Sequence, residues 1–273
     1  MTKRIGFILL LSSLAFVTGC EQKPNIKSIC NDTPALCNDL NTDDGWCRHE
    51  RADVIQSRVA LSSSDLSPDL AKYHLLRDFH TYKKCIEKAA LVEPIVYKEK
   101  KVGRVNALIT AETEIERLEQ ETINSSEPHL AYYHWRIRGD QAAKARFMAI
   151  EDSPALDEPE LAIAMASYYF ERDADKTFAL LYRAISNYKD TLPPSSIYDS
   201  LTTLHLQEKH FEETYVWMLV AQELGNKTIN VRTLERYKAF TDAETEKLTK
   251  LAKLLTEKIK DGKFIPADAK FEF

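Results

Sequence analysis

Apolar residues recur three and four positions apart through most of this chain, the spacing of one face of an α-helix. We find no convincing alternation of apolar and polar residues of the kind that marks a half-buried strand. Proline at the first helical position gives up only an N–H that has no partner there. Prolines stand at four such predicted starts: Ser67-Pro68-Asp69, Glu127-Pro128, Glu158-Pro159-Glu160 and Pro193-Pro194-Ser195. We therefore predict an all-α fold.

A helical hairpin is predicted near the N-terminus. The pattern indicates helices over residues 46–61 and 67–90, joined by the short polar segment Ser62-Ser63-Ser64-Asp65. A connection this short places the two helices antiparallel.

The last predicted helix starts at Thr241-Asp242-Ala243-Glu244, which has the spacing of a capping box, and it ends at Gly262. Its apolar face is one stripe of Leu248, Leu251, Leu255 and Ile259. We expect this helix to cap its neighbours. The alternative is a peripheral membrane helix. We favour the cap because the apolar face contains only leucine and isoleucine and no tryptophan.

Two segments between these helices repeat without gaps at an offset of 37 residues. Leu161, Ala164, Tyr168, Thr177, Phe178, Leu181 and Ala184 align with Tyr198, Leu201, His205, Thr214, Tyr215, Met218 and Ala221. Each segment is predicted as helix, polar turn, helix. A shorter unit precedes them over residues 129–150, with Gly139-Asp140 as its turn.

A period in the thirties with paired helices is typical of a helical solenoid and resembles the tetratricopeptide repeat, although the glycine of that family's first helix is missing. The resemblance implies stacked antiparallel hairpins with a concave surface for a peptide or protein. The contact candidates, each more typical of a core, are Tyr132, Tyr133, Trp135, Tyr168, Tyr169, Tyr198, Tyr215 and Trp217.

The N-terminus has the form of a secretory signal, with Lys3 and Arg4 before an apolar run over residues 5–17 that is shorter than the ~20 residues of a membrane span. Val17-Thr18-Gly19-Cys20 resembles the bacterial lipobox. That resemblance implies cleavage before Cys20, lipid on its thiol and an acylated (palmitate-type) amine, an anchor of two or more chains that holds stably to a membrane. In the lipoproteins of Gram-negative bacteria that this motif resembles, aspartate after the cysteine signals retention in the inner membrane, so Glu21 implies the outer membrane. We expect the periplasmic side of that membrane. The alternative is an ordinary signal with a chance cysteine.

Four further cysteines, Cys30, Cys37, Cys47 and Cys85, imply two disulfides in an exported chain. The hairpin places Cys47 and Cys85 at the same end, so we favour Cys47–Cys85 with Cys30–Cys37. Cys37–Cys85 with Cys30–Cys47 is the second choice. The spacings lack the paired C-x-x-C of a zinc site, and no cofactor or metal is expected.

The formal net charge is −5, which gives no footprint for nucleic acid. One basic cluster stands out, Lys98-Glu99-Lys100-Lys101-Val102-Gly103-Arg104. We interpret it as a solvated turn or helix end, with an anionic-lipid or glycan contact as the alternative.

No nucleophile elbow, P-loop or dinucleotide glycine motif occurs in the sequence. The pairs His129/His134 and His205/His210 lack the i, i+4 spacing of a helical zinc site, and His134 is interpreted as a packed, hydrogen-bonded histidine. Carboxylates such as Glu212-Glu213 fall on predicted turns. We therefore do not expect an enzyme.

Two stretches together resemble an uncharacterised family of gammaproteobacterial lipoproteins, known only as a domain of unknown function. One runs from Ile29-Cys30 through Leu36-Cys37 and Asp39-Leu40-Asn41 to Gly45-Trp46-Cys47-Arg48-His49-Glu50-Arg51, and the other is Leu130-Ala131-Tyr132-Tyr133-His134-Trp135 with Gly139-Asp140. The resemblance implies an envelope lipoprotein and no activity.

From these patterns we divide the chain into a signal (1–19), a tether and disulfide loop (20–45), an N-terminal helical region (46–125), repeats with a capping helix (126–262) and a tail (263–273). The predicted function is a membrane-anchored, helical-repeat interaction module with an envelope protein as partner. An envelope enzyme or glycan-binding protein is the alternative.

Overall fold

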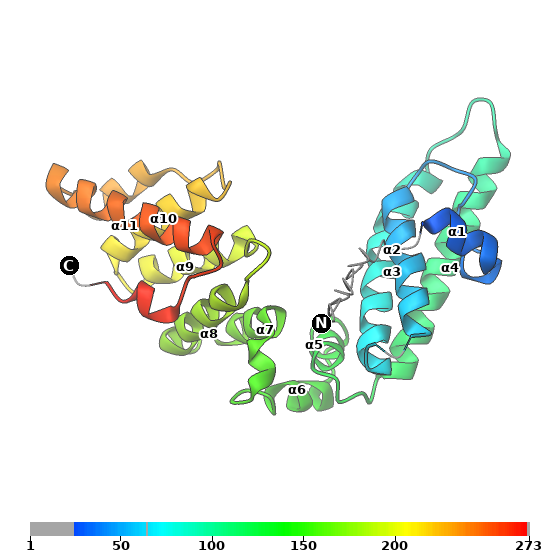
Figure 1. Cartoon of the computed structure of the whole chain (residues 1–273), viewed down its shortest axis with the longest axis horizontal. Helices are drawn as coiled ribbons and strands as arrows, with labels where there is room; N and C mark the ends of the chain where they lie inside the picture. Colours follow the sequence, from blue (N-terminus) through cyan, green and yellow to red (C-terminus); the bar gives the residue numbers. More distant parts are fainter. Residues whose placement is uncertain (1–24, 64, 272–273) are drawn as a thin grey trace, which may run out of the picture.

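The computed structural model describes residues 25–63 and 65–271, and these residues form helices without a strand (Figure 1). The all-α prediction is confirmed for this part of the chain, and Cys20 lies outside it. The α-helices are α1 (Ile26–Asp32), α2 (Arg48–Leu61), α3 (Pro68–Ala90), α4 (Glu99–Thr122), α5 (Pro128–Arg138), α6 (Gln141–Met148), α7 (Pro159–Tyr169), α8 (Ala174–Asn187), α9 (Ser195–Gln207), α10 (Phe211–Glu223) and α11 (Asp242–Lys260). Four short 3-10 helices are η1 (Pro34–Leu36), η2 (Pro154–Asp157), η3 (Val231–Arg236) and η4 (Pro266–Ala269).

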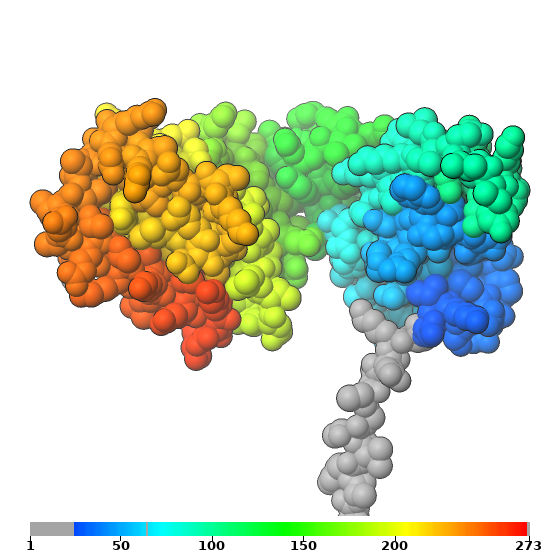
Figure 2. Space-filling model, turned by 90° about the horizontal axis from the view of Figure 1, so that it is seen from above, coloured from blue at the N-terminus to red at the C-terminus, as the bar shows by residue number. Residues whose placement is uncertain are grey.

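The apolar side chains gather into two cores, which correspond to the two arms in Figure 1. Helices α1 to α4 enclose the N-terminal core, and α7 to α11 the C-terminal core. Helix α5 joins them, because Leu130 packs in the first core and the next residue, Ala131, in the second. Figure 2 shows the segment around α5 bridging the two lobes, with a recess between them.

The N-terminal bundle contains the predicted antiparallel hairpin. The disulfide Cys47–Cys85 links the start of α2 to the end of α3, with a Cα–Cα distance of 5.8 Å. Halfway along, Ser57 on α2 donates to Asp78 on α3. Helix α2 starts at Arg48 rather than at residue 46, because Cys47 has a left-handed backbone with φ 55°.

Of the predicted tether and disulfide loop (20–45), residues 20–24 lie outside the described part of the chain, and residues 25–45 form a disulfide-bound segment with short helices. It contains α1 and η1, joined by the Cys30–Cys37 disulfide. Leu40 is buried, and the Tyr82 hydroxyl of α3 hydrogen-bonds to Asn41. This segment is therefore part of the N-terminal core, and both disulfides have the favoured pairing.

The predicted repeat corresponds to two packed helix pairs, α7–α8 and α9–α10. The aligned residues Thr177 and Thr214 are both fully buried, and each hydroxyl donates at 2.7 Å to the carbonyl four residues earlier. The aligned Ala184 and Ala221 are also fully buried, where small side chains let helices approach. Helices α5 and α6 form the shorter, third pair.

The C-terminal helix α11 starts with the predicted capping box, in which Thr241 and Glu244 bond reciprocally. It packs against α10, and Leu248, Leu255 and Ile259 are buried. The segment after it, which the sequence patterns set apart as a tail, packs on the fold: Phe264 is buried and η4 contacts α8.

The prolines before α9 do not occupy the first helical position that the sequence predicted. Helix α9 begins at Ser195, and Pro194 precedes it as the N-cap rather than as the first helical residue.

Candidate binding surfaces

Seven of the eight aromatic residues singled out by sequence are buried in the cores or pack against them; Tyr168 is the exception. Trp217 and Tyr198 are buried and stack on each other, with ring centroids 6.4 Å apart. The Tyr133 hydroxyl donates to Glu119 at 2.5 Å and lies 2.6 Å from His80 Nε2. As expected for most of the set, these three rings stabilise the fold and offer little to a partner.

Trp135 on α5 and Tyr168 on α7 are half-buried and meet edge to face, with centroids 5.5 Å apart. Cations surround this pair. Lys144 Nζ lies 4.9 Å from the centroid of the Tyr168 ring and 5.5 Å from that of the Trp135 ring. The Arg172 guanidinium also contacts Tyr168, 4.5 Å from its ring centroid. Cation–π contacts of this kind hold the cationic side chains beside the rings.

We name this region the aromatic–basic surface: Trp135, Arg136, Lys144, Tyr168 and Arg172. It borders a small hollow of about 80 Å³ between α5 and α7. Ser167 and Arg172 also line a neighbouring hollow of about 290 Å³, which reaches Ser200 of α9. The surface therefore crosses the first helix of each pair. Its three cations, against Glu171 at its edge, suit an anionic partner.

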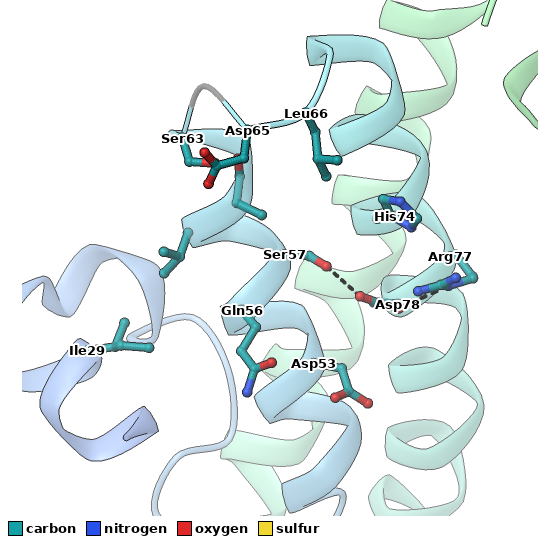
Figure 3. A pocket seen from close by; sticks show the side chains of 12 residues that line it. Ile29, Asp53, Gln56, Ser57, Ser63, Asp65, Leu66, His74, Arg77 and Asp78 are labelled. Carbon is teal, nitrogen blue, oxygen red and sulfur yellow. Dashed lines mark hydrogen bonds and ion pairs between the residues drawn. The ribbon is translucent and has the colours of Figure 1, made fainter. Parts of the chain in front are cut away.

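A third and larger hollow, of about 670 Å³, lies in the N-terminal bundle beside α1, α2 and the first half of α3. We call it the α2–α3 groove. Figure 3 shows its polar side chains on facing helices, with Ser57 and Asp53 on α2 opposite Asp78 and Arg77 on α3. Ile29, Val59 and Leu66 add apolar wall. The groove is open and mixed in character.

Burial and neighbouring charges shift the pKa values of two side chains that line the α2–α3 groove. Burial, followed by the neighbouring charge of Asp78, raises the pKa of the Asp53 carboxyl. Burial and then the Arg77 cation lower the pKa of His74, so this imidazole is neutral at pH 7. The Ser57 hydroxyl donates to the Asp78 carboxylate at 2.5 Å and not to an imidazole. The groove therefore lacks the serine–histidine bond that would activate a nucleophile.

The predicted interpretation of His134 is confirmed. Its ring is buried, and Nε2 lies 2.9 Å from the Thr122 hydroxyl of α4. His129 pairs at 2.9 Å with Glu127, the side chain that also caps α5. His205 is buried at the end of α9, and its Nε2 lies 2.9 Å from the Tyr182 hydroxyl. All three histidines have structural partners.

One group in the described part of the chain has the proximity of metal ligands: atoms of Cys47, Glu50 and Cys85 lie within 4.8 Å of one another. Both sulfurs are joined to each other, however, and a metal needs free thiolates. The group is a crosslink with a carboxylate beside it.

The basic cluster is not wholly solvated as predicted, because Arg104 is buried. Its guanidinium donates to the Asp44 carboxylate and to the carbonyls of Ala89 and Val92 at the end of α3. Burial alone would raise the pKa of Asp44, but hydrogen bonds from Arg104 and the Trp46 N–H, with the charge of Arg104, together outweigh it and lower that pKa. Arg104 therefore fixes the base of the α3–α4 connection.

A family model described as "Protein of unknown function (DUF2989)" matches residues 17–219. No match was found among curated proteins or among solved structures. Among the described residues, none of the helices has the length and apolar character required to cross a bilayer.

Proposed function

On the premise that this chain belongs to the DUF2989 family, whose function is unknown, we propose that it is a membrane-anchored envelope lipoprotein of gammaproteobacterial type that binds a partner protein. The aromatic–basic surface carries this proposal. It combines two half-buried rings with three cations on consecutive helix pairs. Aromatic and arginine side chains are enriched where binding energy concentrates.

The architecture supports an extended ligand. Packed helix pairs that repeat along the chain, here in a tetratricopeptide-like order, present their first helices side by side as a binding surface. The hollows that join α5 to α7 and α7 to α9 follow this direction. We propose an acidic, extended segment of an envelope protein as ligand, since its carboxylates would pair with Arg136 and Arg172.

Cys20 and the two disulfides support the proposed compartment. We propose that Cys20 carries the lipid and holds the chain on the periplasmic side of the outer membrane. Two disulfides support an exported protein, because cytosolic thiols stay reduced. Cys20→Ser would move the protein from the membrane to the soluble envelope fraction. Mass spectrometry of the wild-type chain that finds no acyl groups on Cys20 would contradict a lipid anchor at this residue.

Site-specific crosslinking in cells tests the partner. A photoreactive residue replaces Arg172 in one chain and Lys250 of α11, whose side chain is 74% exposed, in a control. We expect an adduct with one envelope protein at position 172 alone, and we expect Tyr168→Ala to abolish it. Identical products at both positions would exclude this surface. A purified glycan that competes for the adduct would favour the alternative of glycan binding.

A further inference from the structure

The connection between α3 and α4 exposes apolar residues to an unusual degree. Leu91 is 82% exposed, Ile95 94% and Val96 76%, and Tyr97 is more than half exposed. In Figure 1 this connection is the extreme tip of the N-terminal arm. Soluble proteins rarely leave neighbouring large apolar side chains in water without an interaction that covers them.

The apolar surface continues from the loop onto α4. Val102, Val105 and Ile109 follow at helical spacing, and all three are exposed. Trp46, 44% exposed, lies at the same end, with the Arg104 guanidinium 5.6 Å from its ring. We call the loop residues 91–97 with this face of α4 and Trp46 the apolar tip.

Cations border the apolar tip. Residues 84–104 contain six lysines and arginines and three glutamates, whereas the whole chain carries a net charge of −5. Two of these cations are paired, Arg104 with Asp44 and Lys101 with Glu93. Lys84, Lys88 and Lys98 are exposed, and Lys100 lies 4.9 Å from the Tyr97 ring. Aliphatic side chains, interfacial aromatic rings and lysines on one surface form the combination that lies in a lipid interface. Each lysine near an anionic bilayer strengthens binding by about fivefold.

The base of the tip is rigid. Arg104 donates to the carbonyls of Ala89 and Val92 and pairs with Asp44, and the Cys47–Cys85 disulfide fastens the same end of the hairpin. A fixed base presents the loop without a further ordering cost on binding.

We propose that the apolar tip is a second membrane contact, which inserts Ile95, Val96 and their neighbours into the interface of a bilayer with anionic headgroups. The contact is separate from a lipid on Cys20. It would orient the N-terminal arm tip-down on the membrane and so hold the aromatic–basic surface in a fixed position relative to the bilayer.

Fluorescence quenching tests the contact on the full chain. Because Trp46 itself lies in the apolar tip, both reporters are placed in a chain that carries Trp46→Phe. Ile95→Trp puts a reporter on the tip, and Leu254→Trp puts one at a half-exposed position on α11 as the matched control. Trp135 and Trp217 are common to both chains. Each variant is reconstituted in phosphatidylethanolamine–phosphatidylglycerol vesicles that contain brominated lipid, and in phosphatidylcholine vesicles of the same kind. We expect bromine quenching at position 95 and not at 254, and much less quenching in phosphatidylcholine. Absence of quenching at 95 while the protein sediments with the vesicles overturns the tip contact and leaves the Cys20 anchor intact.

Binding of the chain over residues 21–273, which lacks the predicted signal and the anchor residue, gives a second readout. The added substitutions Ile95→Ser with Val96→Ser should lower its partition into anionic vesicles by about tenfold or more, because two exposed apolar side chains are lost. Lys250→Glu in the same chain is the control and should leave partition unchanged. Equal partition of all three chains would overturn the proposal, as would a protein adduct at position 95 in cells without vesicle quenching. Circular dichroism confirms that each variant folds.

Discussion

Protonation of His205 is predicted to destabilise the C-terminal core. The ring is packed 4.2 Å from that of Phe178 and its Nε2 is bonded to the Tyr182 hydroxyl. Burial, with a smaller contribution from the neighbouring His210, lowers the pKa of His205 from 6.5 to about 3. The folded protein therefore holds this imidazole neutral over a pH range in which the unfolded chain would protonate it.

The direction and size of the effect follow from proton linkage. Below pH 6.5 the unfolded state binds more protons at this residue than the folded state, so the contribution to stability is complete above that pH. It is lost as the pH falls toward about 3. With these two pKa values, the free energy of unfolding at pH 5 is lower than at pH 7 by about 2 kcal/mol through His205 alone.

Urea unfolding at pH 7 and pH 5 measures this loss. His205→Gln keeps a nitrogen for the bond to Tyr182 and removes the titration. We expect the wild-type chain to lose about 2 kcal/mol more than the variant between the two pH values. Contributions from the other histidines are common to both chains and cancel. Equal losses in both chains, or an NMR titration of the His205 ring near its ordinary pKa, would refute the reasoning.

Three further outcomes concern stability. Cys47→Ser should lower the free energy of unfolding by about 4 kcal/mol and Cys30→Ser by about 2 kcal/mol. The loss is larger for Cys47 because loop-closure entropy grows with the number of residues between the bonded cysteines, 38 against 7. Equal losses in chemical denaturation would contradict that account. Arg104→Met should lower the free energy of unfolding by about 3 kcal/mol, because the buried Asp44 carboxylate loses its ion-pair partner. Arg117→Met is the control: the ion pairs of Arg117 are largely exposed, so the loss in the same assay should be under about 1 kcal/mol. Gly262→Ala should cost about 1–3 kcal/mol, since φ is 64° and the new Cβ would lie 2.6 Å from the Lys189 carbonyl oxygen; an unchanged thermal midpoint would show that the backbone relaxes there.

Local signals predicted the pairing of helices well. A short polar connection forces neighbouring helices to be antiparallel, and that geometry alone selected Cys47–Cys85 among the possible bridges. The alignment at an offset of 37 residues likewise found Thr177 and Thr214 as equivalent buried positions. Both inferences use only contacts close in sequence or repeated by it.

Long-range partners could not be predicted in this way. Arg104 looked like one more cation of a basic run, and its burial depends on Asp44, sixty residues earlier. The aromatic–basic surface depends on Tyr168 meeting Trp135 across two helices, and sequence patterns gave no reason to add Arg172. The apolar tip, in contrast, does carry a local signal, a run of large apolar residues in a connection between helices.

The two cores make the perturbations at Cys47 and His205 a test of how the molecule unfolds. The disulfide constrains the N-terminal core and the histidine lies against the C-terminal core, and α5 is the helix whose side chains enter both. Distant sites that share no partner act additively. With so narrow a junction, we expect calorimetry to resolve two transitions, with Cys47→Ser lowering one midpoint and His205→Gln reducing the acid-induced shift of the other. A single transition that both changes shift would show that α5 couples the cores into one cooperative unit, in which case the two losses in free energy should add to within about 0.5 kcal/mol.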